Sequence, residues 1–521
     1  MPAGIEKKAL QSRHAGNFPS LFTGLIASLL MAGCMTQPAY RTPEVRMPAA
    51  WHAPQPHAGS RQQLADWWAR FDDPVLSRLI HTAEEGSPSL AQAAARIAGA
   101  RATLASSQAG ALPSVSGSAA LSRARQAQGS GQGQGQPGSS TLTSRSAGLD
   151  ASWEIDLFGK LRKGSEAAEA RLEARVADWH DARVSLAAEV ADNYVQFLGC
   201  RMLAEAYQAE AASQASTLRI TQTAITAGLT ARADGDLAAA SAANANVTAI
   251  AQGIECGVLL KALVALTGES EPALGLVLDT QPPALRDPEG ISVASVPGNL
   301  LRQRPDLAAS ERALAAAYAD IGQADADRYP SLSLGGSISL SASSLASSAT
   351  SWSFGPSLSV PVFDGGKRKA AVASAEASYQ EALASYQNAV RSAVKEVEQA
   401  LLRLDGAARR YQDAERAAQG YRRYFEAVEK NWRAGNVSLL DLEEARRSAI
   451  TAESTLSTLK RDRLRYWIAL YKALGGGWST QAQSAAPASA PGAKPPASGH
   501  NIGPLSDTLA SAASSNQGFA P

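Results

Sequence analysis

Residues 149–160 read LDASWEIDLFGK. A strand pattern ends within this stretch and a long helix is expected to begin after it. Up to Leu157, every second residue is apolar, and the residues between them are Asp, Ser or Glu. This alternation predicts a β-strand with all of its apolar side chains on one face. No proline follows before Pro272, so residues 160–227 predict one unbroken helix. Such a helix would be roughly 100 Å long, which no compact domain needs and which suits a span between two membranes.

The same alternation recurs farther along the chain, in residues 331–340 and 352–362. Segments of about ten residues with one apolar face are typical of transmembrane β-barrels, although a half-buried strand of a soluble sandwich has the same pattern. We expect four such strands in the chain, whereas the smallest membrane barrels use about eight. Because unpaired strand edges cannot face lipid, a membrane location requires several chains to share one barrel.

The chain is an internal duplication. Leu-Pro-Ser-Val-Ser at residues 112–116 recurs as Tyr-Pro-Ser-Leu-Ser at 329–333, and Ala-Gly at 227–228 recurs at 434–435. The spacing between the copies shortens across residues 129–136, a run of Gly, Ser and Gln that we interpret as a loop insertion in the first copy. Each copy of about 200 residues predicts the order helix, strand, loop, strand, long helix, turn, helix.

A sustained heptad repeat runs through the second copy, in a region without proline. One seam has mostly large residues and the companion seam has alanines that allow helices to approach closely. An ordinary cytosolic coiled coil has the same pattern, but the interposed strands and the N-terminal signal argue against it. The two seams are Leu383, Val390, Val397, Leu404 and Tyr411, and Tyr379, Tyr386, Ala393, Ala400 and Ala407.

Residues 1–33 predict a lipoprotein signal peptide. Basic residues precede the apolar stretch 21–32, which is too short to span a bilayer, since spanning takes about 20 residues. Residues 31–34, Met-Ala-Gly-Cys, resemble the lipobox of bacterial lipoproteins, so we expect Cys34 to be lipidated and to become the mature N-terminus. Ordinary signal cleavage beside an unrelated cysteine is the alternative. Met35 follows Cys34 where Asp would signal retention, and this favours the outer membrane.

The composition of three segments predicts linkers or a tail. Residues 34–63 form a proline-rich N-terminal linker that should run extended. The linker between the copies, near residues 270–296, carries four prolines. Residues 479–521 are rich in Ala, Ser, Pro and Gly, and predict a disordered C-terminal tail.

Composition and motifs exclude several functions. With 49 Lys and Arg against 48 Asp and Glu, the chain has no basic excess for nucleic acid. The sequence contains no CxxC, HxxxH, HExxH or phosphate-binding-loop motif, so we expect no metal and no cofactor. Glu154 and Asp156 share one face, as acid–base pairs do, but no His or nucleophile accompanies them. We therefore expect no catalytic residues and no enzyme.

Several motifs resemble the outer-membrane efflux proteins, the TolC-like family, in its lipoprotein branch of OprM/NodT type. The likeness covers residues 64–475, with a first efflux repeat at 64–280 and a second at 290–475. The motifs are Asp66-Trp67-Trp68 with Phe71-Asp72-Asp73-Pro74 and Leu76, Trp153 to Lys160, Arg302 to Leu307 with Ala309, Glu311 and Arg312, and Pro361 to Gly366.

The resemblance implies a mainly α-helical protein with membrane β-strands. Three chains would share a twelve-stranded β-barrel, four strands from each, continuous with a long periplasmic α-helical barrel. The homotrimer would be lipid-anchored in the cell outer membrane and extend into the periplasm. Its partners would be outer-membrane lipid, a periplasmic adaptor and an inner-membrane pump, often of the resistance-nodulation-division class, and not nucleic acid.

The resemblance also implies the function of an exit duct, which passes drugs or other small molecules to the exterior in a tripartite efflux system. A channel for type I protein secretion is an alternative in the same class. A trimeric structural or adhesin lipoprotein is an alternative from another class, and it would need no conduit.

The spacing of two cysteines predicts a disulfide. Cys200 and Cys256 lie equally far from Gly228, at the turn between two antiparallel helices. Equal distances from a turn bring residues side by side, and the periplasm is oxidising. Two buried reduced thiols are the alternative.

Two helix-hairpin tips are candidate docking sites for the adaptor. Residues 228–230, Gly228, Leu229 and Thr230, and residues 435–437, Gly435, Asn436 and Val437, break long helices at matched positions of the copies. Glycine supplies the conformations that tight turns need. In the family, equivalent tips meet the adaptor's helical hairpin; simple helix termination is the alternative.

Carboxylates just beyond the second tip are candidate gate residues. Asp441 and Glu444 are spaced to share one helix face, and Asp236 is a third candidate near the matching place in the first copy. The resemblance implies that they face the lumen, where a trimer would form rings of three carboxylates that attract cations. Crowding would raise their apparent pKa values. The alternative is solvated surface charge near a helix N-terminus, where acidic residues are favoured.

Overall fold

In the computed structural model of this 521-residue chain, the described residues are 37–45, 67–127, 139–279, 285, 303–344 and 346–476. Three predictions lie outside them: the signal peptide with lipidation of Cys34, the inserted loop at 129–136, and the C-terminal tail at 479–521.

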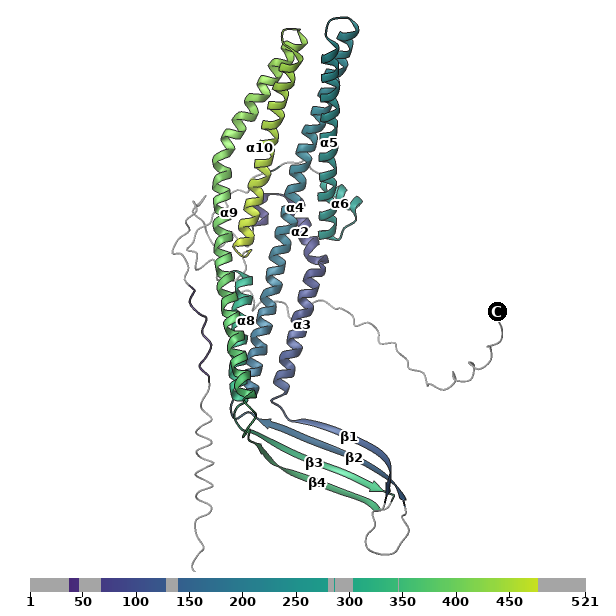
Figure 1. Cartoon of the computed structure of the whole chain (residues 1–521), viewed down its shortest axis with the longest axis vertical. Helices are drawn as coiled ribbons and strands as arrows, with labels where there is room; N and C mark the ends of the chain where they lie inside the picture. The colour runs from purple at the N-terminus through teal and green to yellow at the C-terminus, as the bar shows by residue number, and fades with distance from the viewer. Residues whose placement is uncertain are drawn as a thin grey trace, which may run out of the picture. The chain divides into compact units, whose positions relative to one another are not determined.

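Helices and strands follow the same order in both copies (Figure 1). A short 3-10 helix, η2 (Trp68–Phe71), and α2 (Pro74–Gly86) come first. The first copy then has α3 (Pro88–Ala109), β1 (Ser114–Ala127), β2 (Ser139–Ile155), α4 (Lys160–Thr226) and α5 (Arg232–Thr267). The second copy has α8 (Pro305–Ala326), β3 (Ser331–Ser343), β4 (Ala346–Ser359), α9 (Lys367–Arg433) and α10 (Leu439–Ala473). Both long helices, α4 and α9, have 67 residues, so the predicted order and the predicted helix length are found.

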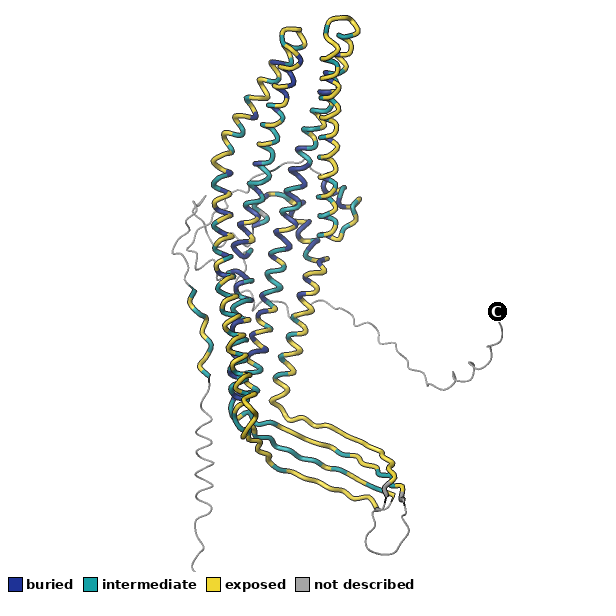
Figure 2. Tube along the Cα trace, viewed as in Figure 1, coloured by how far each residue is buried: buried dark blue, intermediate teal, exposed yellow. Residues whose placement is uncertain are grey.

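The four strands form one antiparallel sheet in the order β1-β2-β3-β4. Apolar residues pair across the strands on one face, as Leu149 does with Ile338 and Ile338 with Trp352. The other face carries mostly serines, together with Asp150 and Glu154, and the hydroxyls of Ser337 and Ser353 lie 2.8 Å apart on it. Within one chain the apolar face is uncovered, with Trp352 78% exposed. Exposed residues predominate along both edge strands, β1 and β4 (Figure 2). The sheet therefore has a large apolar surface that the chain itself does not bury.

Two aspartates end the strands and begin the long helices. Asp156 follows β2 and accepts a hydrogen bond from the backbone N–H of Arg162 at 2.8 Å, in the first turn of α4. Asp364 similarly accepts from Gly366 and Arg368 at the start of α9. The N-cap of each helix is a glycine in the left-handed region, which explains the glycine before each long helix.

At these junctions, the alternation of apolar residues predicted two strands that are longer than the observed ones. Leu157 lies beyond the end of β2, and Val360 and Val362 lie beyond the end of β4. After β2, Asp156 turns towards the N-terminus of α4, so the chain leaves the sheet before the apolar alternation ends. After β4 comes Pro361, which has no backbone N–H to continue the pairing of the strand.

Small side chains allow five helices to pack along α4, namely α2, α3, α5, α8 and α10. Ala167 and Ala191 of α4 are completely buried. The heptad seam predicted in α9 is buried over its middle, where Val397, Ala393 and Leu404 are at most 3% exposed. An aromatic cluster joins η2 to the end of α10, with the rings of Trp68 and Tyr471 4.6 Å apart.

The linker predicted near residues 270–296 is wrong at its start, because Glu271–Leu278 forms a helix, α6. Leu274 is completely buried and Leu278 nearly so. Pro272 favoured a linker in the sequence, but proline is well tolerated in the first turn of a helix. The apolar residues after it then pack against the core.

Residues 37–45 form neither helix nor strand and contact α8. The Gln37 side-chain amide donates to the Tyr318 carbonyl at 3.0 Å, and the Tyr318 hydroxyl donates to the Pro38 carbonyl at 3.1 Å. Thr42 donates to the Glu311 carboxylate at 2.8 Å. This part of the N-terminal linker is therefore fixed to the second copy.

Candidate functional site

The two hairpin tips have the same backbone geometry. Gly228 (φ 73°) and Gly435 (φ 76°) both adopt the left-handed conformation. In each tip the next residue donates its N–H across the turn, Leu229 to Ala224 at 2.8 Å and Asn436 to Asn431 at 2.9 Å. Both tips lie at the end of the helices farthest from the strands (Figure 1).

The tip side chains differ in exposure. Leu229 is 80% exposed, whereas Val437 packs against a small core that includes Val428 and Leu442. The Thr230 hydroxyl donates to Asp234 at 3.0 Å. The first tip thus presents an apolar side chain on the surface.

The predicted gate carboxylates are exposed. Asp441 and Glu444 lie on the exposed side of α10, and Asp236 is exposed on α5. Asp441 also forms a capping box, since it accepts from the Ser438 N–H at 3.0 Å while the Ser438 hydroxyl accepts from the Asp441 N–H at 3.2 Å. The hydrogen bonds from the Ser438 side chain and backbone lower the pKa of Asp441. Within one chain, its carboxylate therefore has a structural role at the helix start.

Sequence reasoning missed a buried polar cluster on the opposite, buried side of α10. Arg446 is only 1% exposed, and its guanidinium donates to Glu443 at 2.5 Å. A second guanidinium nitrogen donates to the Thr217 hydroxyl at 2.9 Å, and the Gln214 amide donates to Glu443 at 2.6 Å. The guanidinium also lies 5.4 Å from the ring centre of Phe425. This cluster joins α4, α9 and α10 below the tips.

Glu210 borders the cluster, 3.8 Å from Arg446. Burial raises the pKa of Glu210, while Arg446 opposes that shift. A signal for the cluster was present in the sequence: Arg446 lies on the side of α10 that also carries Leu442 and Ala449, which are buried. An arginine in an apolar stripe indicates a buried partner.

The predicted disulfide is present. Cys200 of α4 and Cys256 of α5 are joined, with their Cα atoms 5.5 Å apart. The bond links the two helices of the first hairpin across 56 residues of chain. The second hairpin contains no cysteine.

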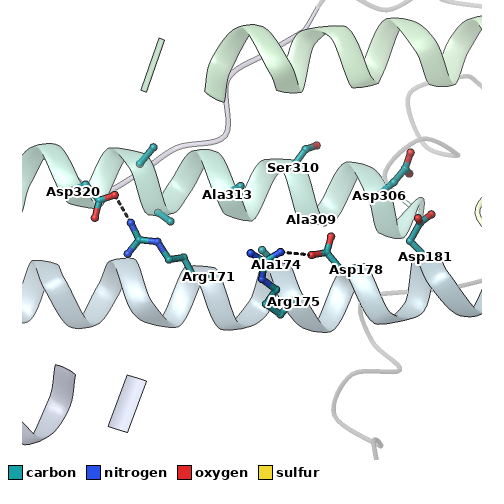
Figure 3. A pocket seen from close by; sticks show the side chains of 12 residues that line it. Arg171, Ala174, Arg175, Asp178, Asp181, Asp306, Ala309, Ser310, Ala313 and Asp320 are labelled. Carbon is teal, nitrogen blue, oxygen red and sulfur yellow. Dashed lines mark hydrogen bonds and ion pairs between the residues drawn. The ribbon is translucent and has the colours of Figure 1, made fainter. Parts of the chain in front are cut away.

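A pocket of about 470 Å³ opens between α4 and α8 (Figure 3). Arg171 forms an ion pair with Asp320, and Arg175 contacts Asp178 at 2.9 Å. Burial, followed by the nearby Asp306, raises the pKa of Asp181. The charges are largely paired within the wall, and the described residues contain no group of three potential metal ligands.

Comparison with known proteins identifies the family. The family model described as "Outer membrane efflux protein" matches residues 79–268 and 296–476. The pyoverdine export outer membrane protein OpmQ of Pseudomonas putida is 33% identical over 462 residues, which cover 87% of this chain and 96% of that protein. Nodulation protein T of Rhizobium leguminosarum bv. trifolii is 28% identical, covering 89% and 98%.

Solved structures have the same fold. The outer-membrane channel OprN matches with a TM-score of 0.74 and 30% identity, over 85% of this chain and all of that one. The Campylobacter jejuni CmeC outer membrane channel matches with a TM-score of 0.76 and 25% identity, over 85% of this chain and 95% of that one. The chain therefore belongs to the outer membrane efflux protein family and is an efflux protein of the outer membrane, not an enzyme.

Proposed function

We propose that three copies of this chain form the exit duct of a tripartite efflux system. The duct passes drugs or other small molecules from a periplasmic adaptor and an inner-membrane pump to the exterior. The observation that carries the proposal is the four-stranded sheet, with its uncovered apolar face and two edge strands, β1 and β4.

The sheet is complete only in an assembly. Its edges cannot face lipid unpaired, and four strands are too few to close a barrel. Three chains would bring twelve strands, with β4 of one copy pairing with β1 of the next. On β2 the apolar face of the sheet extends from Ala147 to Ile155. This length suits a membrane-spanning strand, which requires about 9–11 residues.

The helices also carry a surface that suits a second copy. Val247, Ile250, Ile254 and Val258 of α5 are all more than half exposed and follow helical spacing. Among the described helices, α5 alone has the length and apolar composition to cross a membrane. Because its disulfide fixes it along α4, we assign this apolar stripe to contact with a neighbouring protomer instead.

Small molecules are the favoured cargo. OpmQ is named for pyoverdine export, and another relative is named as the outer membrane protein of a toluene efflux pump. These names favour small-molecule efflux over type I protein secretion. The adaptor would dock at Gly228–Thr230 and Gly435–Val437, and the pump would be of the resistance-nodulation-division class.

The gate would lie beside the second tip. Rings of Asp441 and Glu444, with Asp236 from the first hairpin, would narrow the periplasmic entrance and favour cations. All three carboxylates are exposed within one chain, so a trimer would be able to bring them together around its axis.

Lipidation of Cys34 would hold the trimer at the membrane. Gln37, three residues later, is bound to the end of α8 that leads into β3. Three residues span at most about 10 Å, so the acyl chains would begin near the junction of strands and helices. Loss of acyl labelling in Cys34→Ser supports this assignment; unchanged labelling would contradict it.

The test of the duct is accumulation of a fluorescent small molecule in the native host. Deletion of the gene should raise accumulation, and Gly435→Glu should raise it equally without reducing trimer yield. The control is Gly406→Glu in the middle of α9, where an added side chain meets nothing within 4 Å. Normal efflux by Gly435→Glu would rule out docking at the tip, and a monomeric purified protein would rule out the shared barrel.

A further inference from the structure

The contact between the two copies within one chain is a template for the contact between two chains. Within the chain, β2 of the first copy pairs with β3 of the second, and α4 contacts α10. The hairpin helices lie in the order α5, α4, α10, α9 (Figure 1). This order leaves α5 and α9 at the two ends of the helix layer, as β1 and β4 are the two edges of the sheet. In a ring of three chains, α9 of one copy therefore meets α5 of the next.

The two hairpins correspond residue by residue. Both long helices have 67 residues, and the tip glycines Gly228 and Gly435 follow them at the same distance. The N-caps of the second helices, Ala231 and Ser438, lie equally far beyond these glycines. Each residue of the α4–α10 contact thus has a counterpart in α9 or α5, at the place where two chains would meet.

The template near the tips is the buried cluster around Arg446. Gln214 of α4 donates to Glu443 of α10 at 2.6 Å, and Thr217 of α4 accepts from Arg446 at 2.9 Å. Gln214 is 5% exposed and Thr217 is 3% exposed. Because α10 lies against this face of α4, both polar side chains are buried and paired.

Two exposed tyrosines take the corresponding places on α9. Tyr421 is the counterpart of Gln214 and Tyr424 the counterpart of Thr217, and the two tyrosines are 46% and 56% exposed. Neither hydroxyl has a hydrogen-bond partner among the described residues. Tyrosine is favoured at interfaces because its ring buries apolar area while its hydroxyl finds a polar partner. The face of α9 that corresponds to the covered face of α4 is therefore suited to being covered by another helix.

A carboxylate on α5 takes the place of Glu443. This counterpart is Asp236, which is exposed and has no hydrogen-bond or ion-pair partner in the part of the chain that the structure describes. Tyrosine is longer than glutamine, whereas aspartate is one methylene shorter than glutamate. A Tyr421–Asp236 pair therefore spans a gap similar to that of the Gln214–Glu443 pair.

The side chains beside this pair differ in a compensating way. Ala239, exposed on α5, is the counterpart of Arg446. The small alanine leaves the space that the guanidinium fills within the chain, and the ring of Tyr424 is larger than the Thr217 side chain that it replaces. Asp236 and Ala239 share one face of α5, as Tyr421 and Tyr424 share one face of α9, because each pair is spaced by three residues.

We propose that Tyr421 of one chain donates a hydrogen bond to the Asp236 carboxylate of the next chain, and that the ring of Tyr424 packs against Ala239 beside it. The inference rests on the proposed trimer and adds the residues that join neighbouring hairpins. Three such contacts hold the hairpins together around the periplasmic end of the duct. A hydrogen bond to a carboxylate is stronger than one between neutral groups, so the Tyr421 hydroxyl contributes most to the contact.

The first experiment heats purified full-length trimers and measures the masses of trimer and monomer. Tyr421→Phe deletes only the hydroxyl, and its trimers should dissociate at a lower temperature than wild type. Tyr424→Phe is the matched control and should dissociate like wild type, because Ala239 offers its hydroxyl no side-chain partner. Asp236→Ala should weaken the trimer as Tyr421→Phe does, and the two changes together should add nothing further.

The second experiment places cysteines at the two positions and treats trimers with a short thiol-reactive cross-linker. Tyr421→Cys with Asp236→Cys should give covalent dimers and trimers on denaturing gels. Arg423→Cys with Asp236→Cys is the control, since Arg423 lies on the other side of α9, and it should stay monomeric. The native Cys200 and Cys256 do not interfere, because they are joined to each other.

Equal dissociation temperatures of wild type and Tyr421→Phe would overturn the proposed contact. So would additive effects of Tyr421→Phe and Asp236→Ala, or trimers that cross-link no better through position 421 than through position 423. These outcomes leave the duct intact, since they concern trimers. A wild-type protein that is monomeric before heating would instead refute the trimer, and the contact with it.

Discussion

The two helical hairpins have the same turn geometry, but different contacts hold their helices together. In the first, α4–α5, a disulfide joins the helices and the N-cap of α5 is Ala231, which makes no side-chain hydrogen bond. In the second, α9–α10, Ser438 forms a capping box, and Arg422 of α9 contacts Glu453 of α10 at 2.6 Å. Duplication has kept the turn geometry, whereas the contacts that stabilise it have diverged.

This difference indicates what each hairpin responds to. A covalent link is insensitive to salt and pH but sensitive to reductant. Polar contacts at exposed positions weaken with salt and change with protonation. The second hairpin, which carries Asp441 and Glu444, is therefore the one whose stability should respond more to ionic conditions.

The largest effect should come from breaking the polar cluster of the second hairpin. Glu443→Ala leaves the Arg446 guanidinium buried without its carboxylate, and we expect a loss of about 3–5 kcal/mol in the free energy of unfolding. Glu444→Ala, at the exposed neighbouring position, is the matched control and should have little effect. Thermal unfolding of purified trimers measures both; equal transition temperatures would show that the cluster contributes nothing.

The next effect should come from opening the disulfide of the first hairpin. Cys200→Ser with Cys256→Ser should lower the free energy of unfolding by about 2–4 kcal/mol, because the unfolded chain gains freedom. Hydrogen exchange should quicken in α5 and stay unchanged in α10. Reductant should destabilise wild type and leave the double variant unaffected, and an effect on the variant would contradict this account.

The tips should respond alike to the same substitution. Gly228→Ala and Gly435→Ala each place a side chain on left-handed backbone, where neither meets a neighbour within 4 Å. The strain should lower the free energy of unfolding by about 1 kcal/mol in each variant. A clear inequality between the two would refute the claim that the turns are equivalent.

The smallest effect concerns the caps. Ala231→Ser should give α5 the cap that α10 already has and stabilise the first hairpin by about 0.5–1 kcal/mol. Ser438→Ala should destabilise the second hairpin by a similar amount. Denaturation of the trimers measures both changes, and no gain from Ala231→Ser would mean that the N-cap of α5 is satisfied in another way.

Ser438→Ala should also shift a pH dependence. Ser438 lowers the pKa of Asp441, so the stabilisation is present above the unfolded-state pKa and is lost as pH falls through the lower folded-state pKa. Without Ser438, Asp441 should be protonated at a higher pH. Any block of the channel that depends on its charge should therefore disappear at a higher pH than in wild type.

Most of the fold could be predicted from the periodicity of apolar residues and the positions of proline and glycine. The strands, the 67-residue helices and the turns follow from local patterns that tertiary packing did not override. The errors were local as well: Pro272 suggested a linker where it begins a helix, and the alternation ran past β2 because Asp156 turns to cap α4.

The functional residues were less predictable. Cys200 and Cys256 could be paired because both distances are counted from the same turn. The cluster around Arg446 could not, since its partners Thr217 and Gln214 come from another helix whose register no local pattern reveals.

The most direct test of the central claim, a trimeric duct narrowed by carboxylates of the second hairpin, is planar-bilayer recording of purified trimers. Wild type should form cation-selective channels that divalent cations block from the periplasmic side. Asp441→Ala with Glu444→Ala should lose most of that block, because the carboxylate rings are removed. Absence of channels in wild type, or unchanged selectivity and block in the double variant, would contradict the account.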